Sequence, residues 1–184
     1  DPSAIGKAAI EGILRGGRFR RGGSTITQQT VKNIVDDWEA SFSRKFREMI
    51  RALQLERIYT KKQILEFYLN QFHVVGNGNG IGIAAKYYFN KDVRDLTLVE
   101  AAFIAGSVKG PGKYNPFIKY TKESKAEALK QAHLRKNYVL LQMFEQKWIS
   151  EEEYLQAKQK RIAFNKGEFR NAEVALVELI RSQL

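Results

Sequence analysis

The chain has no cysteine and only two histidines among its 184 residues. The absence of cysteine excludes disulfide bonds and thiolate metal sites, and it leaves the cellular compartment open. His73 and His133 lie far apart in the sequence, which is not the close spacing of a zinc site. We interpret each as a surface or packing residue, and we predict no metal site from the residues.

Long hydrophobic runs are also missing. The longest apolar stretch lies around residues 101–108, whereas a helix that spans a bilayer needs about 20 apolar residues. The chain carries no signal peptide and opens on Asp1-Pro2-Ser3 instead of methionine. We therefore interpret it as a piece of a longer protein.

Acidic residues are too few to balance the basic ones. The chain has 31 Lys and Arg against 20 Asp and Glu, a net charge of +11. Such an excess predicts an anionic partner: nucleic acid, lipid headgroups or a phosphorylated substrate. The length, with 43% hydrophobic residues, suits one domain or two small lobes with a real core.

Proline is scarce, with three residues, and helix-start signals recur. The sequences Thr60-x-x-Gln63, Thr97-x-x-Glu100 and Ser150-x-x-Glu153 are capping boxes, each of which predicts the start of a helix. Further helices are predicted over residues 27–36, 43–57, 123–147 and 171–184, and in the segment after Asp1-Pro2. A short hairpin is predicted around residues 72–81, because Asn-Gly pairs favour tight turns. We predict a mainly α fold without a sizeable sheet.

Two of these helices have a clear apolar face. In the helix over 43–57, one face carries Phe42, Phe46, Met49, Ile50 and Leu53, and the other carries Arg44, Lys45, Glu48 and Arg51. In the helix over 123–147, the side chains expected to point inward are Leu129, Ala132, Leu140 and Phe144.

The run from Gly22 to Gln29 reads Gly-Gly-Ser-Thr-Ile-Thr-Gln-Gln. It is too polar to pack well in a core, but it is suited to binding an oxygen-rich ligand. Its glycines, Gly22 and Gly23, let the backbone come close to a ligand. Ser24 or Thr25 can cap the following helix, whose N-terminus attracts anions. The alternative is a loop and helix cap with nothing bound.

Polar side chains continue along the next helix. Lys32 follows Gln28 and Gln29 at spacings of four and three. We predict that these residues, together with Ser24 and Thr25, form one donor-rich patch for phosphate or sugar oxygens. Glu48 shares a helix face with Arg44 and Lys45, also at spacings of four and three. For the patch around Lys32, the alternative is a polar helix face. For Glu48, the alternative is a solvated surface ion pair.

Four motifs in order resemble signatures of one family, the peptidoglycan glycosyltransferases of class A penicillin-binding proteins and their monofunctional relatives. The second signature is Gly22 to Gln29 with Lys32-Asn33, and the third is Arg44-Lys45-Phe46-Arg47-Glu48. The fourth comprises Tyr68-Leu69-Asn70, the glycines from 76 to 82, Ala84-Ala85 and Tyr88-Phe89-Asn90-Lys91. The fifth comprises Leu98, Glu100-Ala101-Ala102 and Pro111-x-x-Tyr114-Asn115-Pro116. Together they span residues 1–118.

The resemblance implies a lysozyme-like, two-lobed, mainly helical fold over residues 1–184. It implies polymerisation of lipid II into β-1,4 glycan strands with release of undecaprenyl pyrophosphate. It makes Glu48 a catalytic residue that assists at the leaving group or orders the cleft. The substrate-binding residues that it implies, around the pyrophosphate, are Gly23, Ser24, Thr25, Gln28, Gln29, Lys32, Arg44 and Lys45.

The same resemblance supplies partners and a location. The partners are lipid II, the growing glycan strand, a membrane surface and the inhibitor moenomycin, with no nucleic acid expected. The site lies on the outer face of the bacterial cytoplasmic membrane, anchored by a helix upstream of this chain. No cofactor is required, and a divalent cation (Mg²⁺ or Mn²⁺) at the pyrophosphate is allowed although no ligand set is visible.

This sequence departs from the family pattern in three places. The first signature, whose glutamate is the proposed general base, would precede Asp1, so we expect the chain as given to polymerise poorly; any transpeptidase domain would follow residue 184. Ala40 stands where a basic residue is common, and Arg47 is one candidate to replace its phosphate contact. Asn90 replaces a glycine that is common at this position in the family.

We expect Asn70, Glu100 and Tyr114 to be structural residues.

Two other functions remain open from the residues alone. A helical nucleic-acid-binding module would use the +11 charge, but basic and aromatic residues are not interleaved as a base-stacking surface requires. A lysozyme-like hydrolase would need two carboxylates across a sugar-binding cleft.

Overall fold

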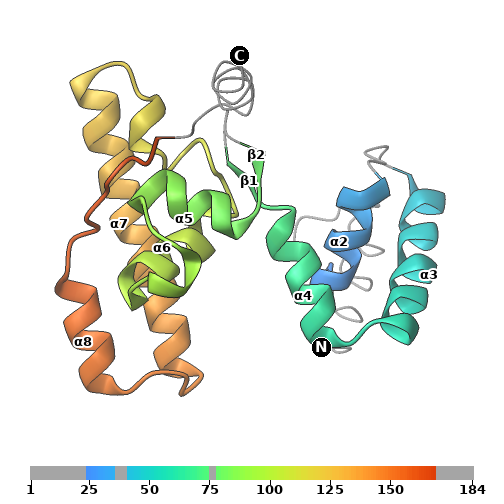
Figure 1. The fold of residues 1–184 in the computed structure, drawn as a ribbon. Helices are drawn as coiled ribbons and strands as arrows, with labels where there is room; N and C mark the ends of the chain where they lie inside the picture. Colours follow the sequence, from blue (N-terminus) through green and yellow to red (C-terminus); the bar gives the residue numbers. More distant parts are fainter. Residues whose placement is uncertain (1–23, 36–40, 75–77, 169–184) are drawn as a thin grey trace, which may run out of the picture. The chain divides into compact units, whose positions relative to one another are not determined.

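The computed structural model describes residues 24–35, 41–74 and 78–168, and the chain divides into two compact units, 1–71 and 72–184. The first unit contains α2 (Ile26–Val35), α3 (Phe42–Ile58) and α4 (Lys61–Asn70). The second contains β1 (His73–Val74), β2 (Gly78–Asn79), α5 (Ile81–Phe89), α6 (Leu98–Ser107), α7 (Lys122–Glu145) and α8 (Glu151–Gln159), with short 3₁₀ helices at Val93–Asp95 and Pro116–Ile118 (Figure 1). The described part is mainly helical, as predicted.

Side-chain caps fix where these helices begin. The capping boxes predicted at Thr60, Thr97 and Ser150 all form, and they start α4, α6 and α8. The predicted hairpin also forms, with His73 opposite Asn79 in an antiparallel pair. The predicted helices near residue 5 and over 171–184 lie outside the described residues. Among the described residues, no helix combines the length and the apolar character needed to cross a bilayer.

In the first unit, α2, α3 and α4 pack against one another around an interior rich in polar groups (Figure 1). The buried apolar residues are Val31, Ala52 and Ile64, and the buried polar ones are Thr27, Gln28, Thr30 and Glu48. Thr27 donates a hydrogen bond of 2.6 Å from its hydroxyl to a carboxylate oxygen of Glu56 on α3. Polar contacts thus set how α2 lies against α3.

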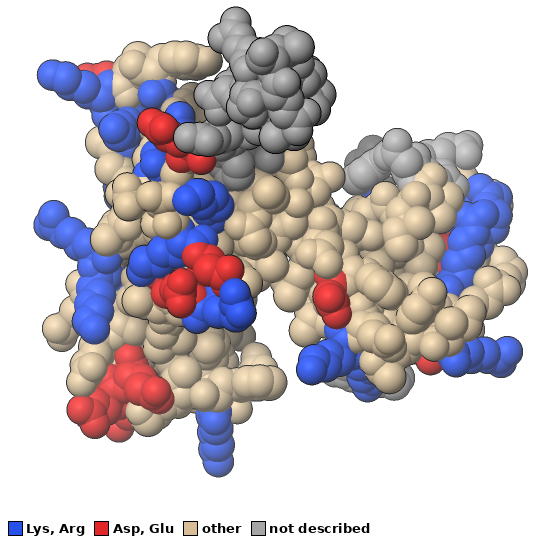
Figure 2. All heavy atoms as spheres, in the orientation of Figure 1, with Lys and Arg blue, Asp and Glu red and all other residues tan. Residues whose placement is uncertain are grey.

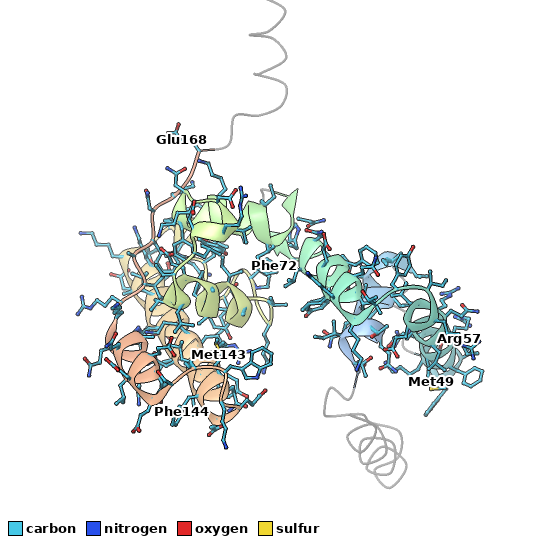
Figure 3. The ribbon with its side chains drawn as sticks, turned by 60° about the horizontal axis from the view of Figure 1, so that its bottom comes forward. Met49, Arg57, Phe72, Met143, Phe144 and Glu168 are labelled. Atoms are coloured by element: carbon cyan, nitrogen blue, oxygen red, sulfur yellow. The ribbon has the colours of Figure 1, made fainter. Side chains whose placement is uncertain are left out.

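The face of α3 that packs inward is the polar one. Its apolar face is exposed: Phe46 is 59% and Leu53 56% accessible, whereas Glu48 on the opposite face is 5% accessible. Met49, labelled in Figure 3, belongs to this exposed face. An amphipathic helix in a soluble protein usually buries its apolar face and exposes its polar one. The exposed apolar face of α3 therefore indicates an interaction surface.

The core of the second unit is a cluster of aromatic rings. Tyr88, Phe89, Phe103, Phe117 and Phe164 contact one another with ring centroids 4.9–6.3 Å apart. Phe164 comes from the extended segment after α8, which is fixed by the backbone hydrogen bond of 2.9 Å from Asn165 N to the Tyr88 carbonyl. Non-polar burial on this scale, with edge-to-face rings, holds α5 and α6 together.

Helix α7 covers this core and carries α8. Ala132 and Leu140 are fully buried, as predicted, and Phe144 is partly buried and stacks on Tyr154 of α8. The prediction that Leu129 points inward is wrong, since it is 39% exposed. The buried positions of α7 are Ala128, Ala132, Lys136 and Leu140, which recur every four residues, and Leu129 lies one position away from this row.

Candidate functional site

The predicted site residues meet where the start of α2 faces the first turns of α3, within the first unit. The Lys45 ammonium donates a hydrogen bond of 2.8 Å to the Ser24 hydroxyl. It also pairs with the carboxylate of Glu48, three residues further along α3. One lysine therefore joins the segment before α2 to the acidic residue of α3.

Glu48 is a buried carboxylate held by two cations. Arg44 Nη1 lies 2.9 Å from Glu48 Oε2, while Lys45 pairs with Oε1. The glutamate side chain is 5% exposed, against 17% for Arg44 and 42% for Lys45. The alternative of a solvated surface pair does not describe this arrangement, because the carboxylate is removed from water and its cations reach toward the surface.

Lys32 shares a small hollow with this pair. The hollow lies between α2 and α3 and is lined by Val31, Lys32, Val35, Arg44, Glu48 and Arg51. Figure 2 shows Lys and Arg side chains gathered over α3. The hollow combines several cations with one compensated carboxylate, a composition that attracts anions.

Thr25 and Gln28 shape the backbone that leads into α2. The Thr25 hydroxyl accepts from Gln28 N at 3.2 Å, and Gln28 Oε1 accepts from Thr25 N at 3.1 Å, so the two residues form a capping box. Gln28 is buried. Its side-chain oxygen is used by the cap, and we therefore assign these two residues to holding the loop in place.

Gln29 has a similar supporting position. Its amide donates to the Ser24 carbonyl at 3.2 Å, and its Oε1 accepts from the Tyr68 hydroxyl at 3.4 Å. Burial raises the pKa of Tyr68, which keeps this hydroxyl protonated as a donor. Sequence reasoning placed Tyr68 in a signature but gave it no contact with the site. The predicted site residue Gly23 lies outside the described residues, as does Ala40.

Two residues predicted to be structural do occupy structural positions. Glu100 accepts from Thr97 N at 2.8 Å and from the Lys91 ammonium at 2.9 Å, so it joins the start of α6 to the loop after α5. Burial raises the pKa of the Glu100 carboxyl, but the hydrogen bonds from Thr97 and Lys91 outweigh it and hold this pKa below its usual value. Tyr114 is buried in the aromatic core.

The histidines do not gather with other ligands. His73 pairs through Nδ1 with Asn79 Oδ1 at 2.9 Å across the hairpin. His133 is partly buried, and burial together with nearby Lys136 and Arg161 lowers its pKa. Within the described ranges, no three His, Asp or Glu side chains come together as a metal site would require.

Comparison with known proteins shows the family of this chain. The family model described as Transglycosylase matches residues 1–144. The chain belongs to the transglycosylase family. Penicillin-binding protein 1A of Aquifex aeolicus is 42% identical over 166 residues, which cover 90% of this chain and 22% of the relative. Penicillin-binding protein 1A of Neisseria meningitidis is 36% identical over 186 residues, covering all of this chain and 22% of the relative.

A solved structure agrees with this transglycosylase assignment. The crystal structure of penicillin-binding protein 1A from Haemophilus influenzae matches with a TM-score of 0.51 and 30% identity, over 84% of this chain and 19% of that one. This transglycosylase thus spans about a fifth of the length of the curated relatives it matches. The comparisons support the mainly helical fold of this family and give no support to the nucleic-acid-binding alternative.

Proposed function

We propose that this transglycosylase forms the glycan chain of peptidoglycan from lipid II. The growing strand, held on a lipid pyrophosphate, would be the donor, and the 4-hydroxyl of a lipid-linked disaccharide–pentapeptide would be the acceptor. The observation that carries the proposal is the Ser24–Lys45–Glu48–Arg44 cluster. It places fixed cations beside the start of a helix, in a family whose relatives are penicillin-binding proteins.

The reaction needs charge stabilisation at the leaving group. The acceptor oxygen forms a bond to C1 of the donor sugar, the bond from C1 to the phosphate oxygen breaks, and the configuration inverts. The bond's electron pair leaves with the undecaprenyl pyrophosphate. Arg44, Lys45 and Lys32 stand where they would neutralise that charge, Arg as a fork of donors and Lys as a point charge.

Glu48 acts in this proposal by holding the cations. Its two carboxylate oxygens are engaged by Arg44 and Lys45, so both cations are in place before a substrate binds. Ser24 fixes the other side of the Lys45 ammonium. Pre-oriented charges need no rearrangement during the reaction, which is how such groups lower a barrier. The acceptor's proton goes to another carboxylate, the one that the family's first signature supplies.

A divalent cation does not fit the described side chains of this site. Mg²⁺ and Mn²⁺ prefer oxygen ligands, carboxylates above all. Glu48 is the carboxylate that lines the hollow, and both of its oxygens are bound to cationic side chains. We therefore derive no step through a metal and assign charge neutralisation to the side chains.

The exposed apolar face of α3 supports a membrane partner. Its Phe46, Ile50 and Leu53 stand beside basic residues of the same helix. Apolar side chains flanked by arginines suit the boundary between headgroups and acyl chains. The substrate's lipid would reach the site from that surface, which would be the outer face of the cytoplasmic membrane.

Moenomycin binding tests the proposed function. Calorimetric titration would compare moenomycin, a phosphoglycolipid that imitates the donor strand, with the same compound lacking its phosphate. We expect binding that depends on the phosphate. Equal binding of both compounds, or tighter salt-dependent binding of duplex DNA than of moenomycin, would reject the proposal.

A further inference from the structure

The hollow between α2 and α3 contains a cation that belongs to none of the four signatures. Arg51 lines it together with Lys32, Arg44 and Glu48. We propose that Arg51 is a further substrate-binding residue, which contacts the second phosphate of the donor pyrophosphate. This inference rests on the proposed function above and adds one residue to the same site.

Helical spacing places Arg51 on the correct face of α3. Arg44, Glu48 and Arg51 follow one another at spacings of four and three, so they share one side of the helix. Opposite them, α2 contributes Val31, Lys32 and Val35 to the hollow. With a rise of about 1.5 Å per residue, Arg44 and Arg51 are separated by about 10 Å along the axis. The cationic stripe is thus longer than one phosphate group, and it can contact a ligand with two.

The charges around the hollow favour an anion. Glu48 is already compensated by Arg44 and Lys45. Arg51 forms no ion pair with the residues that the structure describes. The Nε of Arg44 is buried without a hydrogen-bond partner in the described structure. Arg51 therefore adds a positive charge to a hollow whose carboxylate is already paired, which favours an anionic group there.

Arg51 also answers a question raised by the sequence. Ala40 stands where the family pattern commonly has a basic residue, and Arg47 is one candidate to replace the phosphate contact. Arg47 does not line the hollow, whereas Arg51 does. Arg51, four positions further along α3, is therefore the better placed of the two arginines to contact a ligand in the hollow.

The test is calorimetric binding of farnesyl pyrophosphate and farnesyl monophosphate to the 184-residue chain. The variants are Arg51→Gln, Arg51→Lys and Lys32→Ala, with Arg57→Gln as the matched control. Arg57 lies in the last turn of the same helix, is exposed, and carries the same charge outside the hollow (Figure 3). Circular dichroism before each titration verifies that the variant is folded.

We expect Arg51→Gln to weaken pyrophosphate binding about fivefold and monophosphate binding less than twofold, since an exposed charge contact contributes about 1 kcal/mol. Arg51→Lys restores most of the affinity, and Arg57→Gln changes neither probe. If Lys32→Ala weakens binding while Arg51→Gln behaves like Arg57→Gln, the role of Arg51 is rejected and the proposed function stands. If the folded wild-type chain binds neither probe nor moenomycin, both are rejected.

Discussion

The ammonium of Lys45 is shared between two residues that lie on different elements. It donates to the hydroxyl of Ser24, 21 positions earlier in the chain, at 2.8 Å, and it pairs with Glu48 on its own helix. The segment before α2 is therefore tied to the buried carboxylate of α3 through one cation. This link explains how two distant signatures, each unremarkable as a helix cap or an ion pair, make one site.

Replacement of Ser24 by alanine should weaken moenomycin binding without unfolding the protein. The change removes the oxygen that orients Lys45 from the α2 side, and we expect a loss of about three- to tenfold, since a hydrogen bond to a charged group contributes about 1 kcal/mol or more. The control is Ser43→Ala, whose hydroxyl lies on the exposed side of α3 and pairs with Ser41 at 3.2 Å. Equal affinities in calorimetry for Ser24→Ala and Ser43→Ala would contradict the role of this contact.

Replacement of Glu48 by glutamine should destabilise the first unit. The neutral amide leaves Arg44 and Lys45 close together without their shared carboxylate. Breaking a fully buried pair costs about 3–5 kcal/mol, and partial exposure of both cations reduces our expectation to about 1–2 kcal/mol. Urea unfolding measures this, with Glu66→Gln on the exposed side of α4 as the control. A free energy of unfolding equal to that of the control would show that the carboxylate does not hold the cations.

The charge of Glu100 should stabilise the protein only above acidic pH. Its pKa is held below the usual value, so the unfolded chain binds its proton more readily than the native one. The stabilisation is then complete above the ordinary glutamate pKa of about 4.3 and disappears as the pH falls through the lower native value.

Comparing Glu100→Gln with the wild type at two pH values isolates this contribution, because glutamine can still accept the capping hydrogen bond from Thr97. We expect the variant to be less stable than the wild type at pH 7, because glutamine cannot replace the ionised carboxylate that pairs with Lys91. At pH 3 the difference should shrink toward zero. A difference in urea unfolding that is the same at both pH values would contradict the linkage.

Removing apolar groups from the outer face of α3 should reduce membrane binding and leave stability unchanged. Phe46 and Leu53 are more than half exposed, so the double change to serine loses little folding energy. Burial of two such side chains in a lipid surface contributes about 3 kcal/mol, so we expect binding to anionic vesicles to fall about a hundredfold. Tyr120→Ser is the control, because Tyr120 is fully exposed in the second unit. If co-sedimentation with vesicles is reduced equally in the control, the apolar face of α3 is not the membrane-binding surface.

Local signals in the sequence predicted the elements well. The capping boxes at Thr60, Thr97 and Ser150 mark helix starts because the capping side chain lies only three residues from the backbone group that it satisfies. The hairpin was also predicted, but Gly78 and Asn79, expected in its turn, lie in strand β2. The prediction for Leu129 failed because the buried face of α7 runs through Ala128, Ala132, Lys136 and Leu140, and Leu129 lies one position off that face.

The site was only partly predictable. The signatures identified Ser24, Lys45 and Glu48, but no spacing rule predicts that Lys45 reaches across to Ser24. The amphipathic pattern of α3 was visible, yet it gave no sign that Glu48 on the polar face would be buried, because partner helices decide which face packs. Arg51 was assigned to that polar face without a function, since only the tertiary arrangement brings it to the hollow beside Lys32.

An NMR titration of the ¹⁵N-labelled chain with moenomycin tests most directly whether α2 and α3 build a phosphate site. We predict that amide shifts concentrate at Ser24, Thr25, Lys32, Lys45 and Glu48, and that the phosphate-free compound does not reproduce them. Shifts that gather instead on α7 and α8, or that are identical for both compounds, would contradict a phosphate site built by α2 and α3.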